Sequence, residues 1–154
     1  MNWWNLIYMG SIYQEKQNPT ILFDGLAQFL AETKYNKSAL SVDFYGSQYP
    51  LLWLSKEIEK WNLCDIVKQH EAIPHWEAIK IEKEASWLWV MGWEDPKENG
   101  VTPYKLFEYL GSGRPILLTG GYKNAEVVKI LKETYAGMWC PNAEAVKSFL
   151  YDTI

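Results

Sequence analysis

Short apolar runs alternate with amphipathic stretches along almost the whole chain. Trp4 to Ile12 is apolar, aromatic and β-branched, which predicts a buried strand that stops near Gly10. From Thr20 to Thr33, apolar side chains recur on one face of a helix that Pro19 opens. The same patterns predict further strands at residues 40–45, 64–68, 87–91, 115–119 and 136–140, and further helices at 51–61, 75–85, 102–111, 123–135 and 143–150.

This alternation predicts the fold class. Strand and helix alternate about six times, which is typical of an α/β protein with a Rossmann-like, doubly wound parallel sheet of about six strands. Trp87 to Met91 (WLWVM) is apolar without alternation, which indicates a central strand covered on both faces. No linker or repeat interrupts the pattern, so we expect a single domain over residues 1–154. Its ligands should gather at the carboxyl ends of the strands.

Charge and cysteine content narrow the function classes. The chain carries 15 basic and 19 acidic residues, a net charge of −4, and Arg114 is its single arginine, so we expect no nucleic-acid partner. No apolar stretch approaches the roughly 20 residues of a bilayer span. Cys64 and Cys140 stand far apart in predicted strands, and no secretion leader precedes Trp3. We therefore expect two buried thiols in a cytoplasmic protein.

The common catalytic and cofactor motifs do not occur in the sequence. His70 and His75 lie five residues apart with Pro74 between them, which does not match the spacing of zinc ligands. The sequence has no Walker phosphate loop, no dinucleotide-binding glycine motif and no nucleophile elbow. It also has no Asp-x-Asp pair to hold a divalent ion beside a diphosphate. We therefore predict no metal or other cofactor and leave the catalytic residues unassigned.

The segment GVTPYKLFEYLGSGRPILLTGG suits an anion. The predicted helix start presents backbone N–H groups at Thr102 and Tyr104, and Lys105 adds a full positive charge. Glu108 follows Lys105 by three residues on the same side of the helix and can accept hydrogen bonds from two hydroxyls. Together these groups could hold the phosphates and sugar of one nucleotide. Spacing alone favours a simpler interpretation, an exposed Lys–Glu pair on a surface helix.

The string TPYKLFEYLGSGRPILL also resembles the carboxy-terminal domain of retaining GT-B glycosyltransferases, in the glycosyl transferases group 1 (glycosyltransferase family 4-like) family. These proteins have a Pro-x-Lys-Leu-x-Glu-Tyr-Leu helix, then a Gly-x-Pro turn and an apolar strand. The stretches IYMGSIY, VDFYG, IPHWEAIKIEKEASWLWVMG and YAGMWCPNAEAVKSFL extend the resemblance over the whole chain. It implies one half of a GT-B fold, the domain that binds a nucleotide-sugar donor, with the amino-terminal acceptor domain absent.

The resemblance also implies how the phosphates and the ribose of the donor are bound. Glu108 takes the place of the second glutamate of the family's E-x7-E motif, which binds the donor ribose. The place of the first glutamate falls on Gly100, and Glu98 lies two residues before it. The family's Arg and Lys that grip the diphosphate correspond to Ser11 and Lys16. Half of that basic pair is therefore missing here, which fits either a divergent branch in which Lys105 compensates for it or a member whose activity has weakened.

The remaining expected donor contacts lie in loops. The loop of residues 72–74 corresponds to the family's base-reading loop, where Ile73 is the expected contact, although an isoleucine packed beneath Pro74 explains the same residue. The strand-end and loop positions expected to complete the donor site are Gly10, Val101, Thr102 and Tyr104.

Two functions remain open. The first is the donor-binding half of a glycosyltransferase that moves a sugar from a nucleoside diphosphate to an unknown acceptor without a metal, inactive without its amino-terminal domain. Any peripheral membrane association would run through that missing half. The second is a non-catalytic nucleotide-sugar-binding or protein-interaction module of the same fold, which Gly100 and Ser11 favour. An exposed interdomain surface would carry the aromatic side chains of Trp3, Trp4 and Trp93.

Overall fold

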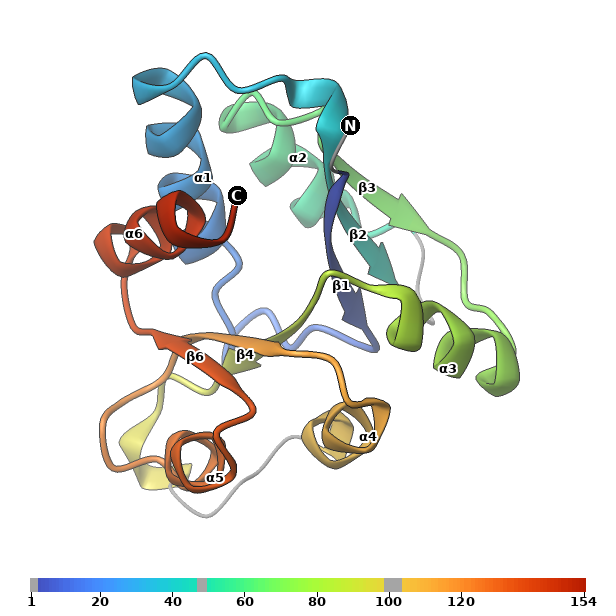
Figure 1. Cartoon of the computed structure of the whole chain (residues 1–154), viewed down its shortest axis with the longest axis vertical. Helices are drawn as coiled ribbons and strands as arrows, with labels where there is room; N and C mark the ends of the chain where they lie inside the picture. The colour runs from blue at the N-terminus through green and yellow to red at the C-terminus, as the bar shows by residue number, and fades with distance from the viewer. Residues whose placement is uncertain (1–2, 47–49, 99–103) are drawn as a thin grey trace.

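The computed structural model describes residues 3–46, 50–98 and 104–154 and places helices on both faces of one parallel sheet (Figure 1). The strands are β1 (Trp4–Met9), β2 (Leu40–Tyr45), β3 (Val67–His70), β4 (Trp87–Gly92), β5 (Ile116–Gly120) and β6 (Gly137–Cys140). The α-helices are α1 (Thr20–Glu32), α2 (Leu52–Lys60), α3 (His75–Glu84), α4 (Tyr104–Ser112), α5 (Glu126–Thr134) and α6 (Ala143–Thr153), and two short 3₁₀ turns cover Lys37–Ala39 and Pro96–Glu98.

The six strands follow the order β3-β2-β1-β4-β5-β6. All neighbouring pairs are parallel, as in the registers Met9 with Tyr45 and Met91 with Thr119. This arrangement confirms the expected fold class. Chain order reverses between β1 and β4, so the loops that follow these two strands diverge and leave a crevice at the carboxyl edge of the sheet.

The core consists of one apolar layer on each face of the sheet. Side chains alternate along β1, so Leu6 and Tyr8 pack with α1, α2 and α6, whereas Ile7 and Met9 pack with α3, α4 and α5. Figure 1 shows α1 and α6 side by side, away from α3, α4 and α5. The expected central strand is confirmed, because Leu88 in β4 is 0% exposed and every later residue of the strand, to Gly92, is also buried.

Several expected element boundaries are corrected by the structure. The apolar run from Trp4 to Ile12 extends past β1, which ends at Met9, next to the expected stop near Gly10, because Gly10 has φ +121° and turns the chain out of the sheet. β3 begins at Val67 and not at residue 64, since the apolar residues before it are buried in a turn. α5 begins at Glu126, three residues later than the pattern predicts.

The prediction of two buried thiols is wrong for one cysteine. Cys64 lies in the exposed turn before β3, whereas Cys140 is buried at the end of β6, where burial raises the pKa of its thiol to about 12. The hydrophobic pattern misleads here because Leu63 and Ile66 turn inward around Cys64.

The expected set of exposed tryptophans is also only partly correct. Trp3 is 61% exposed and Trp93 is half-buried, but Trp4 is buried and its ring packs edge-on against Phe149 of α6. Trp4 is buried because it is already the first residue of β1. None of the described helices is both long enough and apolar enough to cross a membrane.

Candidate functional site

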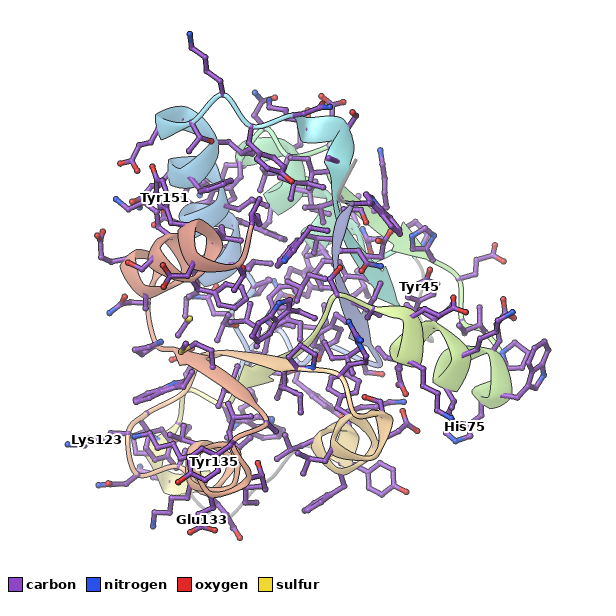
Figure 2. All side chains as sticks on the ribbon, in the orientation of Figure 1. Tyr45, His75, Lys123, Glu133, Tyr135 and Tyr151 are labelled. Atoms are coloured by element: carbon purple, nitrogen blue, oxygen red, sulfur yellow. The ribbon has the colours of Figure 1, made fainter. Side chains whose placement is uncertain are left out.

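Two hollows lie at the carboxyl edge of the sheet, where β1 and β4 diverge. The larger, of about 370 Å³, is formed by the ends of β1 and β4, the loop after β1 and the start of α4. The smaller, of about 200 Å³, extends towards β2 and α3 and is lined by Tyr45, Ile73 and His75. Figure 2 labels two of these side chains, Tyr45 on β2 and His75 at the start of α3. Gly10 and Lys105 line both hollows, so the two meet at these residues.

Gly10 fixes the wall between the two hollows. Its backbone N–H donates to the carbonyl of Tyr45 over 2.8 Å, and its φ of +121° is strained for any residue with a side chain. A Cβ atom at this position would lie 3.7 Å from Cε of Lys105. That distance is an ordinary van der Waals contact, so it is the positive φ of the turn, and not a lack of space, that requires glycine here.

Ser11 and Lys16, the expected diphosphate contacts, lie at different places on the loop after β1. Ser11 is exposed and lines the larger hollow, and its carbonyl accepts a hydrogen bond from the Tyr8 hydroxyl at 2.9 Å. Lys16 is half-buried, and its Nζ lies 5.8 Å from the centre of the Trp93 ring. Lys16 lines a third hollow, described below, and is not among the described residues that line these two.

Gln17 anchors this loop to the sheet. Its side chain is buried, and its Oε1 accepts a hydrogen bond from the backbone N–H of Tyr13 at 3.0 Å. Its Nε2 donates to the carbonyl of Met91 in β4, also at 3.0 Å. The side-chain amide of Gln17 thereby links the loop after β1 to β4, at the point where the two strands diverge. A glutamine inside a polar loop gave no sequence signal for this role.

Tyr109 holds α4 against the end of β1. Its hydroxyl accepts a hydrogen bond from the backbone N–H of Met9 at 2.9 Å, and the ring is 1% exposed, so burial raises the pKa of the phenol. Lys105 and Glu108 precede it on the same helix and are thus placed beside the Gly10 turn. Tyr104, the first residue of α4, is 83% exposed and lines the larger hollow.

Lys105 and Glu108 form part of a four-residue cluster between α3 and α4. Nζ of Lys105 donates to Oε2 of Glu108 at 2.7 Å, and Nε2 of His75 lies 3.5 Å from the other oxygen, Oε1. Glu82 approaches from beneath, with its Oε1 3.9 Å from the lysine Nζ. The interpretation as an ordinary exposed pair does not hold, because the Glu108 side chain is only 15% exposed and Glu82 is 1% exposed.

Of the two glutamates of this cluster, one holds a proton and the other carries a negative charge. Burial, reinforced by a hydrogen bond to Glu108, raises the pKa of Glu82 to about 8. The same hydrogen bond, with Lys105 and His75 nearby, lowers the pKa of Glu108. At neutral pH, Glu82 is therefore the protonated donor and Glu108 the charged acceptor.

Sequence reasoning missed Glu82 and treated His75 only as a helix start. His75, Ala78 and Glu82 are spaced by three and four residues, so helical periodicity could have placed them on one face of the predicted helix. The missing information was which other helix this face meets. Of the remaining expected residues, Ile73 both lines the smaller hollow and packs against the core, while Val101 and Thr102 lie outside the described residues.

The cluster can hold a ligand that carries both negative charge and hydroxyl groups. Lys105 presents a cation at the junction of the two hollows, and Glu108 behind it can accept hydroxyl hydrogen bonds. Glu108 does not itself line either hollow, since Lys105 and His75 stand in front of it. Within the described parts of the chain, no group of three or more His, Cys, Asp or Glu side chains is arranged to hold a metal ion.

Solved structures of larger proteins contain the same fold. WaaG, a glycosyltransferase involved in lipopolysaccharide biosynthesis, matches 97% of this chain with a TM-score of 0.73 and 14% identity. Sucrose-phosphate synthase from Thermosynechococcus elongatus matches 97% with a TM-score of 0.64 and 17% identity. S. aureus MnaA, in a co-structure with UDP, matches 98% with a TM-score of 0.57 and 10% identity.

These likenesses show the fold. The chain has the Rossmann-like fold of a domain in GT-B glycosyltransferases, as the sequence resemblance implied. It spans only 38% of the length of WaaG, and 37% of sucrose-phosphate synthase and of MnaA. No protein-family model and no curated protein matches the chain by sequence.

Proposed function

We propose that this chain is the donor-binding domain of a glycosyltransferase, with a nucleoside diphosphate sugar as its ligand. The observation that carries the proposal is the Lys105–Glu108 pair at the junction of two hollows, beside the crevice where doubly wound sheets bind nucleotides. The fold shared with WaaG and sucrose-phosphate synthase supports the enzyme class.

The proposed pose divides the nucleotide between the two hollows. The base enters the smaller hollow against Ile73 and Tyr45, and the phosphates lie in the larger hollow over the start of α4. Lys105 turns from Glu108 to the diphosphate, which is the stronger anion, and the ribose hydroxyls replace it on Glu108. Lys16 supplies further positive charge from the loop after β1. Binding of phosphate through lysines and the helix start requires no resident metal.

A second candidate function is a non-catalytic module that binds nucleotide sugars or proteins. The observation in its favour is that Glu108 already has Glu82, Lys105 and His75 as partners. In that case, Lys105 stays paired in the cluster and does not leave it for a phosphate.

Isothermal titration calorimetry with UDP and GDP tests the proposal. We expect binding of at least one nucleotide, and a loss of about tenfold or more for Lys105→Gln, since a charge-assisted contact to phosphate is removed. Lys80→Gln is the matched control, because Lys80 is an exposed lysine on the neighbouring helix α3 and lines neither hollow. Absence of binding at millimolar nucleotide would contradict the proposal and favour a protein-interaction module, and equal affinity in both variants would remove Lys105 from the site.

A further inference from the structure

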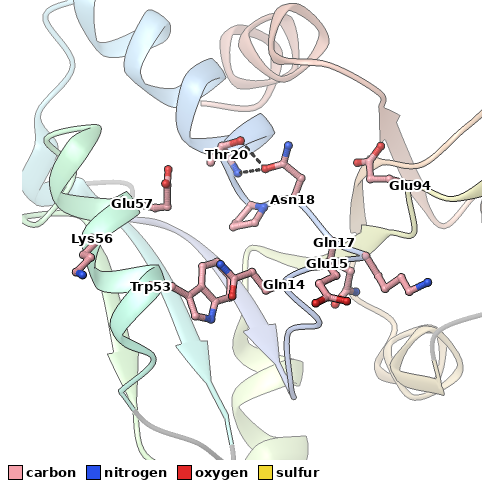
Figure 3. Close-up of a pocket in the computed structure, with 11 residues that line it drawn as sticks. Gln14, Glu15, Gln17, Asn18, Thr20, Trp53, Lys56, Glu57 and Glu94 are labelled. Atoms are coloured by element: carbon pink, nitrogen blue, oxygen red, sulfur yellow. Dashed lines mark hydrogen bonds between the residues drawn. The ribbon is translucent and has the colours of Figure 1, made fainter.

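A third hollow, of about 480 Å³, lies on the other side of the loop that follows β1. Figure 3 shows its walls, formed by residues 14–20, which run from that loop into the start of α1, by α2 and by Glu94 after β4. Its volume falls within the range of about 300–1,000 Å³ that is usual for small-molecule sites. Gln17 lines both this hollow and the larger hollow of the nucleotide site, so the two cavities are direct neighbours.

The side of the hollow on α2 combines an aromatic face with a carboxylate. Trp53 and Glu57 are one helical turn apart and both line the hollow. Trp53 is half-buried and packs against the core, so its indole is held as a fixed surface. Oε2 of Glu57 is buried without a hydrogen-bond partner. Because Oε2 receives no hydrogen bond, a ligand hydroxyl that donates to the other oxygen, Oε1, would stabilise the charge of this carboxylate.

The other walls supply more hydrogen-bonding groups than the α2 side. Glu15 and Glu94 add two carboxylates, and Gln14 and Asn18 add amide groups that can donate as well as accept. Asn18 is positioned by the start of α1, because its Oδ1 accepts hydrogen bonds from both the backbone N–H and the hydroxyl of Thr20 (Figure 3).

The charge of the lining selects the class of ligand. The lining residues include three carboxylates, Glu15, Glu57 and Glu94, and two lysines, Lys16 and Lys56, which gives a formal charge of 2 − 3 = −1. A phosphate or another anion is therefore disfavoured here, in contrast to the cluster at Lys105. A neutral sugar fits all the groups, since its hydroxyls donate to carboxylates and its C–H face carries the positive edge that an indole face attracts.

We propose that this hollow, which we term the Trp53 hollow, binds a neutral sugar unit with its ring against Trp53. This binding follows from the lining of the Trp53 hollow alone and does not depend on the proposed function.

Titration of the ¹⁵N-labelled chain with glucose, galactose, N-acetylglucosamine and maltose tests the proposal by NMR. We expect saturable shifts of the Trp53 indole N–H and of the backbone amides of residues 14–18 and 20, with a Kd in the millimolar range. Trp53→Ala should raise that Kd about tenfold or more, because the aromatic face is lost. Trp3→Ala is the control, since Trp3 is a tryptophan outside the Trp53 hollow that precedes β1, at the opposite edge of the sheet.

Further variants and ligands separate a loss of folding from a loss of sugar binding. Glu57→Gln preserves the shape of the side chain, and it should weaken sugar binding even if Trp53→Ala fails to fold. The affinity for UDP should be unchanged in Glu57→Gln, because Glu57 lies outside the nucleotide site. A wild-type chain that binds a sugar but not UDP would contradict the proposed function and leave the sugar site intact. Absence of saturable shifts with every sugar at about 100 mM would overturn the proposal, since even binding a hundredfold weaker than 1 mM would be detected there. Shifts at the Trp53 hollow produced by inorganic phosphate or spermidine, and not by any sugar, would also overturn it.

Discussion

At the scale of single residues, the charge beside the crevice depends on which of two neighbouring carboxyl groups holds a proton. Glu82 is almost completely buried and faces Glu108 and Lys105. Ionising Glu82 would place two carboxylates next to each other, so its pKa rises to about 8 while the pKa of Glu108 falls. Glu108 therefore remains an acceptor with a full negative charge at neutral pH, ready for a hydroxyl donor.

Replacing Glu82 by Gln should flatten the pH dependence of stability. In the wild type, the folded chain retains a proton that the unfolded chain loses above the ordinary pKa of 4.5, so this source of stability is complete below pH 4.5 and is lost as the pH rises through about 8. Within this window, the free energy of unfolding falls by up to about 1.4 kcal/mol per pH unit. Glu108 acts in a separate pH range. Its lowered pKa contributes stability at neutral pH, and this contribution is lost only as the solution becomes more acidic.

Urea denaturation of the wild type and Glu82→Gln between pH 5 and pH 9 measures this effect. The variant should gain stability relative to the wild type as the pH rises, since Gln stays neutral and can still donate to Glu108. Glu84→Gln, an exposed carboxyl on the same helix, should follow the wild type. Parallel curves for Glu82→Gln and the wild type would show that Glu82 has an ordinary pKa.

The proposed ribose contact of Glu108 can be tested by pairing a variant with a modified ligand. Glu108→Gln should weaken UDP binding by roughly 1.5–3 kcal/mol, or one to two decades in Kd, because a charge-assisted hydrogen bond is lost. The wild type should bind 2′-deoxy-UDP more weakly than UDP. Glu108→Gln should bind the two nucleotides about equally well. Additive losses would place the 2′-hydroxyl elsewhere.

At the scale of elements, the sequence pattern is sufficient for the order of strands and helices and insufficient for their contacts. Long periodic segments such as Thr20–Glu32 were predicted to within a residue, because each has a clear apolar face. The short strand Val67–His70 was misplaced, since two of its four side chains are only half-buried and Lys68 is exposed. The site residues on α4, Lys105 and Glu108, could be predicted because they depend on the sequence of one helix alone. Glu82 was missed because its role requires α3 to pack against α4, which local patterns do not encode.

The contact between α1 and α6 provides a test of packing at this scale. A Cβ atom on Gly25 of α1 would lie 2.5 Å from Cγ1 of Val146 and 2.8 Å from the carbonyl oxygen of Ala143, so Gly25→Ala should force these helices apart. We expect a loss of about 1–3 kcal/mol in the free energy of unfolding, despite the better helix propensity of alanine.

Gly111→Ala is the matched control for this change. Gly111 also lies in a helix, α4, but an added Cβ would meet no atom within 4 Å. We therefore expect an unchanged or slightly higher stability, by up to about 1 kcal/mol. Guanidinium denaturation of both variants gives the comparison, and equal effects would mean that α6 adjusts to Gly25→Ala without strain.

At the scale of the whole molecule, the features proposed to bind ligands gather at one edge of the sheet. The nucleotide crevice and the Trp53 hollow lie on either side of the loop after β1, with Gln17 between them. The opposite edge carries Trp3, which is 61% exposed. Under the proposed function, this domain contacts the donor from one side only, and the chain spans 38% of the length of WaaG.

The 154 residues alone should therefore bind a donor without consuming it. Transfer needs an acceptor held in line with the sugar, and this positioning accounts for about 7–11 kcal/mol of the barrier in well-oriented reactions. Incubation with UDP-glucose, UDP-N-acetylglucosamine or GDP-mannose, followed by chromatography of the free nucleotides, should show no release above buffer at concentrations where calorimetry detects binding. Glu108→Gln serves as the control for contaminating hydrolases, which it would leave unchanged. Release that the wild type catalyses and Glu108→Gln does not would mean that the catalytic groups lie within this chain, and the search for them would then begin at the residues that line the crevice.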